Sequence, residues 1–383
     1  MTAPQAQAAV TNPQAQAELC VLLTPRELGG HEAALLGWLG DAARTAGLRA
    51  ALVAPTALLR QACQAAGLGD SLLPLSDRTW PRAQVLAALQ RWPRGTPVLL
   101  APGVLHVAAW LLAAAVALGH RVWVYVPMCF SAARMGFRGA ALRDAALAPW
   151  LRGVERWITV QPQQARLLTD RWGLSAPVHV LPNRARLPVG GPQAPSPAAD
   201  GRLRLAWVGR FDPWQKGLDW LTQTLATDPA FSRGVHWRFQ GRGAFAGALH
   251  RLQQKLGPDC MQVHAHAPID EALAQSDALL LCSRFEGLPL VALEATARGW
   301  PVLASVESGL SDLLPPSSQF HFGDAAGLRR AVALFADPAQ RHRAVDHARE
   351  RLAHSQAALP YADALDELAA ALRAAPRAQT QPC

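Results

Sequence analysis

Hydrophobic and polar positions follow one repeating order along this chain: a short apolar run, then a longer segment with apolar residues every three or four positions. Short apolar runs predict strands buried on both faces, and the longer segments predict helices packed on them. The predicted strands span 20–24, 51–54, 98–101, 122–126, 157–160, 178–181, 203–208, 237–240, 261–263, 278–281 and 302–304. Strands that alternate with helices indicate parallel α/β sheets.

A segment rich in Pro, Gly and Ser, residues 188–197, interrupts this order and marks a linker. The 383 residues suffice for two domains. We expect two doubly wound, Rossmann-like parallel-sheet domains facing a cleft, with ligands beyond the carboxyl ends of the strands. The predicted parts are a disordered tail (1–17), an N-terminal domain (18–187), the linker (188–201), a C-terminal domain (202–357), a C-terminal helix (358–374) and a tail (375–383). The sequence leaves open whether the C-terminal helix crosses back to the N-terminal domain.

Cysteine usage and the length of the apolar runs bear on the compartment. The six cysteines are scattered, with no CxxC pair and no metal-ligand spacing, so we expect free thiols in a reducing compartment. The best candidate for a membrane span, residues 107–118, is shorter than the roughly 20 residues that a bilayer requires. No secretory signal pattern is visible at the N-terminus. These features predict a cytoplasmic protein.

The basic charge is confined to the first half of the chain. Residues 1–190 contain 18 Arg and no Lys against 9 acidic residues, whereas the 17 Arg and 2 Lys of residues 191–383 are balanced by 19 acidic residues. The first half therefore holds the whole formal excess of +9, with Arg134, Arg138, Arg143, Arg152 and Arg156 in one stretch. Such a face suits an anionic membrane surface, a lipid-linked diphosphate or an acidic glycan. No nucleic-acid module is present, and a merely solvated basic surface is the alternative.

Residues 283–294 are the most informative segment of the chain. They follow the strand predicted at 278–281 and turn into a helix for which Pro289 suits the first position. A strand, a glycine turn and a helix N-terminus together make an anion site. Glu286 and Glu294 flank it eight residues apart. If both were helical, this spacing would correspond to about 12 Å, a scale wider than the carboxylate pairs of glycosidases. This spacing suits two carboxylates that accept hydrogen bonds from opposite ends of an extended nucleotide sugar. The alternative is an ordinary amphipathic helix with solvated glutamates.

A second strand–loop–helix connection contains Gly209, Arg210, Lys216 and Gly217. Lys216 is one of only two lysines in a chain that otherwise uses Arg, so its place beside a glycine in this loop is informative. Arg210 and Lys216 could place two cations on one diphosphate, and a hydrogen bond to a charged group contributes roughly 1.5–3 kcal/mol. A solvated basic loop is the alternative.

Residues 203–314 resemble the retaining glycosyltransferases of family 4, which have the GT-B fold. The resemblance rests on Gly209-Arg210, Lys216-Gly217, Gly241-Arg242-Gly243, Glu286-Gly287-Leu288-Pro289, Glu294 and Gly299-Trp300-Pro301-Val302. It implies that Arg210 and Lys216 hold the donor diphosphate, near Gly209 and Gly241. It also implies that Glu286 contacts the transferred sugar and Glu294 the ribose. Backbone amides around Gly287, Leu288, Pro289 and Leu290 would cap the phosphate and the sugar.

The N-terminal half matches that family less well. Gly29 and Gly30 fit the family's Gly-Gly-x-Glu element near the acceptor, and a plain tight turn with a locally capped helix is the alternative. Where the family often has a His, at the end of the fourth strand, this chain has Pro127 and its neighbours. His106 is a weak candidate for the role of the missing His. Two further departures are His266 and Ser308, where the family often has Gly.

The resemblance implies transfer of a hexosyl group from a UDP- or GDP-sugar to a hydroxyl of a glycan or lipid-linked acceptor, with retention, in cell-surface polysaccharide or lipopolysaccharide biosynthesis. We expect no cofactor and no metal, because two cations and a helix end can neutralise the diphosphate and no Asp-x-Asp triplet occurs. We also expect contact with the inner face of the plasma membrane. The rival functions are a nucleotide-sugar epimerase or phosphorylase, and a non-catalytic binder or scaffold in a polysaccharide assembly complex.

Overall fold

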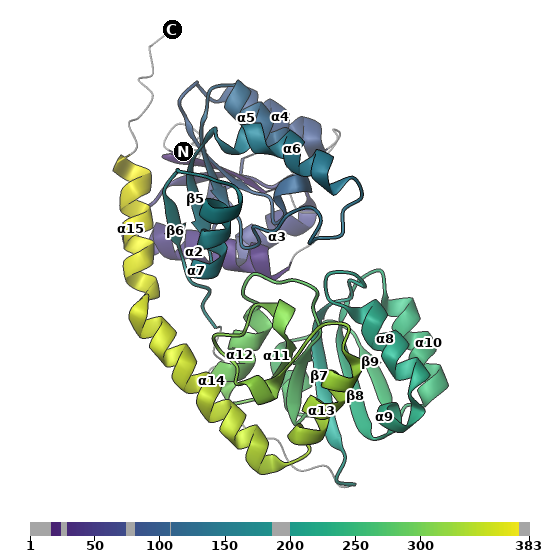
Figure 1. Cartoon of the computed structure of the whole chain (residues 1–383). Helices are drawn as coiled ribbons and strands as arrows, with labels where there is room; N and C mark the ends of the chain where they lie inside the picture. The colour runs from purple at the N-terminus through teal and green to yellow at the C-terminus, as the bar shows by residue number, and fades with distance from the viewer. Residues whose placement is uncertain (1–16, 24–28, 74–80, 108, 186–199, 375–383) are drawn as a thin grey trace, which may run out of the picture. The chain divides into compact units, whose positions relative to one another are not determined.

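The computed structural model describes residues 17–23, 29–73, 81–107, 109–185 and 200–374. The predicted tails (1–17 and 375–383) and the predicted linker (188–201) fall almost entirely outside these ranges. The described residues form two parallel sheets with helices between successive strands (Figure 1).

The first sheet has six parallel strands in the order β2-β1-β3-β4-β5-β6. Their bounds are β1 Leu19–Leu23, β2 Ala50–Val53, β3 Pro97–Ala101, β4 Arg121–Tyr125, β5 Val154–Thr159 and β6 Val178–Val180. Every residue of β1 and β2 is buried, as the continuous apolar runs predicted for strands covered on both faces. The accompanying helices are α2 Gly30–Ala46, α3 Ala57–Ala65, α4 Pro81–Arg91, α5 Ala109–Ala117, α6 Ala140–Leu151, α7 Pro162–Arg166 and α15 Tyr361–Ala374.

The second sheet also has six parallel strands, in the order β12-β11-β10-β7-β8-β9. Their bounds are β7 Leu203–Arg210, β8 Val235–Arg242, β9 Met261–His264, β10 Ala278–Leu281, β11 Val302–Ser305 and β12 Gln319–Phe320. The accompanying helices are α8 Leu218–Thr227, α9 Pro229–Arg233, α10 Ala246–Leu256, α11 Ile269–Leu273, α12 Leu290–Arg298, α13 Ala325–Phe335 and α14 Pro338–Ala358. Each sheet has its own buried core.

Every predicted strand is present, and the predicted parallel sheets are confirmed. The sequence missed β12, whose two residues are too few to show a hydrophobic period. The strands β7 and β8 run two residues further than predicted, because Gly209 pairs with Gly241 and Arg210 with Arg242. A Cβ atom on Gly241 would lie 1.8 Å from the Gly209 carbonyl oxygen, so this close pairing requires glycine.

The expected start of helix α12 was wrong by one residue. Pro289 caps the helix with φ −68° and ψ 118°, and the helix begins at Leu290. Proline fixes only φ, and the extended ψ keeps Pro289 outside the helix. The helix N-terminus nevertheless lies directly after the glycine turn, as the sequence indicated.

Contacts within the chain divide the described elements into two compact units. The first contains β1–β6, α2–α7 and nearly all of α15, in which Leu365, Leu368 and Leu372 are buried. The second contains β7–β12, α8–α14 and also residues 130–138, which lie between β4 and α6 in the sequence.

Candidate functional site

The predicted donor-site residues lie in two connections at the carboxyl edge of the second sheet and in the ends of the elements beside them. One connection follows β7 and contains Lys216, and the other follows β10 and contains Glu286. Since β7 and β10 are parallel neighbours in the sheet, their carboxyl ends meet at the same edge. The sheet therefore brings together two segments that are 70 residues apart in the sequence.

Lys216 and Glu286 form an ion pair between Nζ and Oε1. Ser283 donates a second hydrogen bond to the same carboxylate oxygen at 2.9 Å. The Glu286 side chain is only 8% exposed and that of Lys216 18%, so the pair is largely shielded from water. Charges held in such a site interact more strongly than charges in bulk water.

Gly217 holds the Lys216 loop against the turn after β10. Its φ is +68°, and a Cβ atom there would lie 1.9 Å from the carbonyl oxygen of Cys282. The Cys282 thiol in turn donates to the Lys216 carbonyl at 3.3 Å. Only glycine permits this approach, which explains the Lys-Gly pair in structural terms.

Arg210, at the end of β7, lies at a more open position than Lys216. Its Nη2 donates to Oε1 of Gln215 at 2.9 Å and is 3.5 Å from a carboxylate oxygen of Asp212. The Arg210 side chain is 42% exposed. The guanidinium is therefore oriented by its own loop while it stays accessible to a ligand.

Arg284 was not among the predicted site residues, yet it organises the Lys216 loop. Its guanidinium forms a bidentate pair with Asp219 at 2.7 and 2.9 Å. It also lies over the rings of Trp214 and Phe322, at 4.0 and 4.4 Å. Its backbone N–H donates to the carbonyl of Gln215 at 2.9 Å. The Arg284–Asp219 pair joins positions 65 apart, which no local sequence pattern reveals.

Residues 130–138 pack against the same loop. Trp214 donates through Nε1 to the carbonyl of Met135 at 3.0 Å. Gly136 has φ +75°, and a Cβ atom on it would lie 2.4 Å from the Trp214 ring. Phe130 meets Phe285 edge to face with ring centres 6.0 Å apart. This segment therefore supports both connections of the candidate donor site.

The N-terminus of α12 is held by a chain of buried hydroxyls and one amide. Asn183 donates to the carbonyl of Leu288 at 2.8 Å. Ser305 donates to the carbonyl of Ser283 at 2.7 Å and shares a 2.8 Å hydrogen bond with Ser308. Ser308, which departs from the family pattern, thus has a structural function behind the Glu286 turn. Glu294 is half-buried on α12, and its carbonyl accepts a hydrogen bond from Arg298.

In the first unit, Gly29 and Gly30 begin helix α2. Gly29 has φ −136°, an extended conformation that any residue can adopt, so its backbone conformation does not require glycine. The Gly29 N–H donates to Oε2 of the buried Glu32 at 2.6 Å. The glycine–glutamate pattern here forms a helix cap, which was the structural alternative.

His31 was missed by the sequence analysis. Its ring stacks on Tyr125, the last residue of β4, with centres 4.9 Å apart. Neither ring nitrogen has a hydrogen-bond partner among the described residues, although the backbone of Ala101 lies close enough to raise the pKa of the ring slightly against the effect of burial. Burial lowers the pKa of His31, and nearby Glu32 only partly opposes this shift. A neutral imidazole therefore lies at the end of the strand where Pro127 replaces the expected His.

His106, the substitute that we named, is buried and engaged elsewhere in the first unit. Its Nε2 lies 2.6 Å from Oδ1 of Asp144, and Arg171 approaches the other carboxylate oxygen at 3.7 Å. His106 thus joins the short helix at Leu105–Val107 to α6. Its catalytic role remains a prediction.

The described residues contain no group of three or more His, Cys, Asp or Glu that could hold a metal ion. None of the described helices has the length and apolarity needed to cross a bilayer. The described cysteines occur in both units and are all free thiols.

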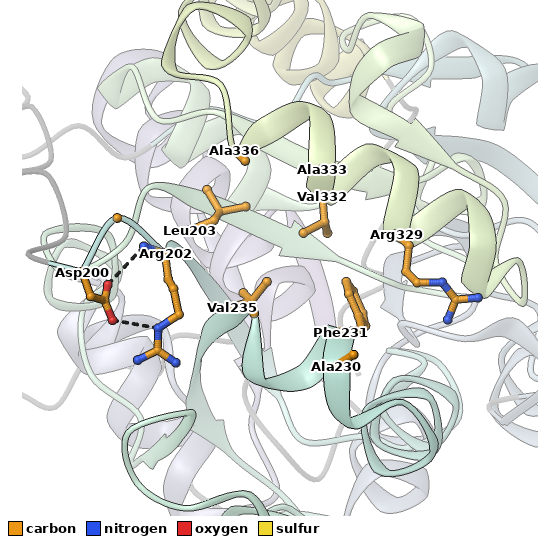
Figure 2. Close-up of a pocket in the computed structure, with 12 residues that line it drawn as sticks. Asp200, Arg202, Leu203, Ala230, Phe231, Val235, Arg329, Val332, Ala333 and Ala336 are labelled. Atoms are coloured by element: carbon orange, nitrogen blue, oxygen red, sulfur yellow. Dashed lines mark hydrogen bonds and ion pairs between the residues drawn. The ribbon is translucent and has the colours of Figure 1, made fainter.

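A shallow groove of about 380 Å³ lies at the other end of the second sheet (Figure 2). Leu203 and Val235, the first residues of β7 and β8, line it together with Phe231 and Val332. Because Arg210 ends β7, the groove and the donor-site residues are separated by the full length of that strand, about 26 Å for eight residues. The groove is not part of the candidate donor site.

The fold defines the class of protein: two six-stranded parallel α/β units with the GT-B glycosyltransferase fold. HepE of Anabaena, crystallised with UDP and glucose, has a TM-score of 0.70 at 14% identity, covering 93% of this chain and 99% of that chain. Sucrose-phosphate synthase of Thermosynechococcus elongatus has a TM-score of 0.64 at 17% identity, covering 93% and 98%.

Residues 159–380 match the family described as Family 4 Glycosyltransferase in conflict systems. The chain belongs to this family and is a glycosyltransferase. It is also similar to glycogen synthase of Mycobacterium tuberculosis, with 28% identity over 294 residues, 70% of this chain and 69% of the relative. The predicted family-4 resemblance and the GT-B fold are thereby confirmed.

Proposed function

We propose that the protein transfers a hexosyl group from a UDP- or GDP-sugar to an acceptor hydroxyl with retention of the anomeric configuration. The observation that supports this most directly is the shielded Lys216–Glu286 pair, which lies at a sheet edge beside the N-terminus of α12. Two similar proteins support a sugar nucleotide as the donor: one is a glycogen synthase, and the other, HepE, was crystallised with UDP-glucose.

In the proposed reaction the bond between the anomeric carbon and the diphosphate oxygen breaks, and its electron pair leaves with the diphosphate. A bond from the acceptor oxygen to the anomeric carbon forms, and the acceptor proton is released. Lys216 and Arg210 stabilise the charge on the diphosphate together with the backbone N–H groups at the start of α12. Gly209 and Gly241, paired near the carboxyl ends of β7 and β8, lie beside the donor diphosphate in this proposal.

Glu286 and Glu294 have separate roles in this proposal. Glu286 accepts hydrogen bonds from hydroxyls of the transferred sugar, because its second carboxylate oxygen is left for them while Oε1 binds Lys216 and Ser283. Glu294 accepts hydrogen bonds from the ribose hydroxyls. The two cations and the helix end replace a metal, so the proposed reaction needs neither metal nor cofactor.

The acceptor side of the proposal is a glycan or lipid-linked hydroxyl, as in cell-surface polysaccharide or lipopolysaccharide synthesis. The support is the excess of arginine in the first half of the chain, which suits an anionic acceptor or an anionic membrane surface. Gly29 and Gly30 border the acceptor in this proposal. The chain would then act at the inner face of the plasma membrane as a peripheral protein.

The test is a panel of nucleoside diphosphates and their sugar conjugates, read first by thermal shift and then by release of nucleoside diphosphate. Binding to the folded state raises the melting temperature by mass action. Anomeric NMR of the product decides between retention and inversion, and activity after treatment with a chelator decides the metal requirement. A non-catalytic binder would show the thermal shift without turnover.

The two lysines of the chain provide a matched pair of variants. Lys216→Ala should reduce turnover about 100-fold or more, the usual cost of losing one group that stabilises transition-state charge. Lys255→Ala removes an exposed lysine of α10 and should leave turnover unchanged. Glu286→Gln keeps the size of the side chain and should reduce turnover to a similar degree. Equal rates in wild type, Lys216→Ala and Glu286→Gln would overturn the site assignment.

A further inference from the structure

Helix α6 of the first unit presents an apolar face to solvent. Six of its positions are exposed and apolar: Ala141, Leu142, Ala145, Ala146, Pro149 and Trp150. Leu142 is 78% exposed and Trp150 37%, two of the four large hydrophobic side chains that stand exposed in the described chain. At about 100° per residue these six positions form one continuous stripe along the helix.

The opposite side of α6 already packs on the protein. Leu147 and Leu151 are buried in the first core, and the half-buried Asp144 pairs with His106. The outward face of such a helix is normally polar. In α6 it is apolar along the whole helix, so the face is built to be covered by something other than the core of its own unit.

Arginines border the stripe on both sides. At about 100° per residue, Arg143 lies at one edge and Arg152, which follows the last turn, at the other. Both are exposed. Asp144 is the sole acidic residue between 138 and 152, and its carboxylate lies near His106 and Arg171 instead of on the stripe. The rim of the apolar face is therefore cationic.

We propose that this face of α6 lies on an anionic lipid bilayer. Leu142 and Trp150 enter the interface, where tryptophan is favoured because one end of its ring is apolar and the other carries an N–H. Arg143 and Arg152 keep their stems along the apolar surface while their guanidinium groups bind lipid phosphates. The proposed face is the surface through which the protein would make the peripheral membrane contact of the proposed function, and the inference rests on that contact. It does not depend on which donor the protein uses.

The size of the face disfavours a second protein molecule as its occupant. A helix of 12 residues is about 18 Å long, so a stripe about 10 Å wide covers on the order of 200 Å². A stable protein interface buries roughly 800 Å² on each partner. A bilayer has no such minimum, because each inserted side chain and each arginine adds its own contribution.

The test is co-sedimentation of the full chain with phosphatidylcholine vesicles that contain or lack phosphatidylglycerol. The wild type should bind the anionic vesicles and bind neutral ones far less. The double variant Leu142→Gln/Trp150→Gln should lose affinity roughly tenfold or more, because two apolar side chains leave the interface. The matched control is Leu334→Gln, which changes a leucine of α13 that is 48% exposed.

The charge contribution is tested separately. Arg143→Gln/Arg152→Gln should lose roughly fivefold in affinity per arginine, and only for anionic vesicles. Its control, Arg330→Gln/Arg343→Gln, changes two exposed arginines of α13 and α14. Brominated lipids should quench less fluorescence in Trp150→Phe than in the wild type, because only a tryptophan in the interface meets the bromine atoms.

Three results would overturn the proposal: no binding of anionic vesicles, equal binding by the wild type and the Leu142/Trp150 variant, or a dimer in solution that this variant abolishes. All variants are also measured by thermal shift with nucleoside diphosphates. Unchanged nucleotide binding with lost vesicle binding assigns the effect to α6. A wild type that binds vesicles but no nucleotide would instead contradict the proposed donor site.

Discussion

Lys216 and Glu286 are a candidate site because their ion pair is shielded from water. Each has the other as its ionic partner, and Ser283 adds a neutral donor to the same carboxylate. Breaking such a pair leaves one charge in a shielded place without compensation, which is costly. A bound diphosphate would supply that compensation for Lys216. The pair is therefore a suitable ligand-free arrangement for an anion site.

His31 gives a prediction at the same scale, through the pH dependence of stability. Its pKa in the folded protein is lowered by burial, whereas the unfolded chain has a value of about 6.5. Below that pH the unfolded state binds a proton that the folded state does not, so stability falls as the pH falls through this range. His31→Phe keeps the stacking on Tyr125 and should reduce this slope by up to about 1.4 kcal/mol per pH unit.

The measurement is the free energy of unfolding of the first unit in urea between about pH 7.5 and about pH 5.5. Part of the slope should persist in His31→Phe, because burial also lowers the pKa of His120 and His179 in the same unit. The control His342→Phe changes an exposed histidine of α14. An identical slope in the wild type and His31→Phe would show that His31 is not the buried neutral group described above.

At the scale of elements, residues 130–138 hold the Lys216 loop through Trp214. Gly136→Ala should displace the Trp214 ring, because the new Cβ atom would lie 2.4 Å from it. We expect a loss of about 1–2 kcal/mol from the positive φ and about 1–3 kcal/mol from the clash. The affinity for nucleoside diphosphate should fall as well, since Trp214 stands two residues before Lys216.

Gly139→Ala is the control for that prediction. Gly139 also has a positive φ, +65°, but no atom lies within 4 Å of a Cβ atom built there. It should lose only the backbone contribution of about 1–2 kcal/mol and keep its affinity for nucleoside diphosphate. Chemical denaturation and titration calorimetry compare the two variants. Equal effects on both quantities would show that the contact with Trp214 does not support the loop.

At the scale of the whole molecule, the two units have separate cores and should unfold in separable transitions. Leu111→Ala in the first core should lower one calorimetric transition, and Leu225→Ala in the second core the other, by about 2–5 kcal/mol each. The nucleoside diphosphate that binds should raise only the transition that Leu225→Ala lowers. A single transition shifted equally by both substitutions would contradict this independence.

The parallel sheets were predictable because a strand covered on both faces must be apolar at every position. The run at 278–281, for example, matches β10 residue for residue. The start of α12 was missed by one residue because proline restricts φ and leaves ψ open. The strand β12 was missed because two residues show no periodicity.

The candidate site divides in the same way. The sequence by itself determined that a glycine turn and a helix start lie in the two connections, because both are local features. Gly217 and Pro289 are the residues that indicate them. Only the tertiary structure decided that Lys216 pairs with Glu286, that Arg284 binds Asp219, and that His31 reaches Tyr125. These contacts join positions far apart in the chain, and the order of strands in each sheet creates them. No local pattern encodes that order, since the same apolar runs could pair in other arrangements.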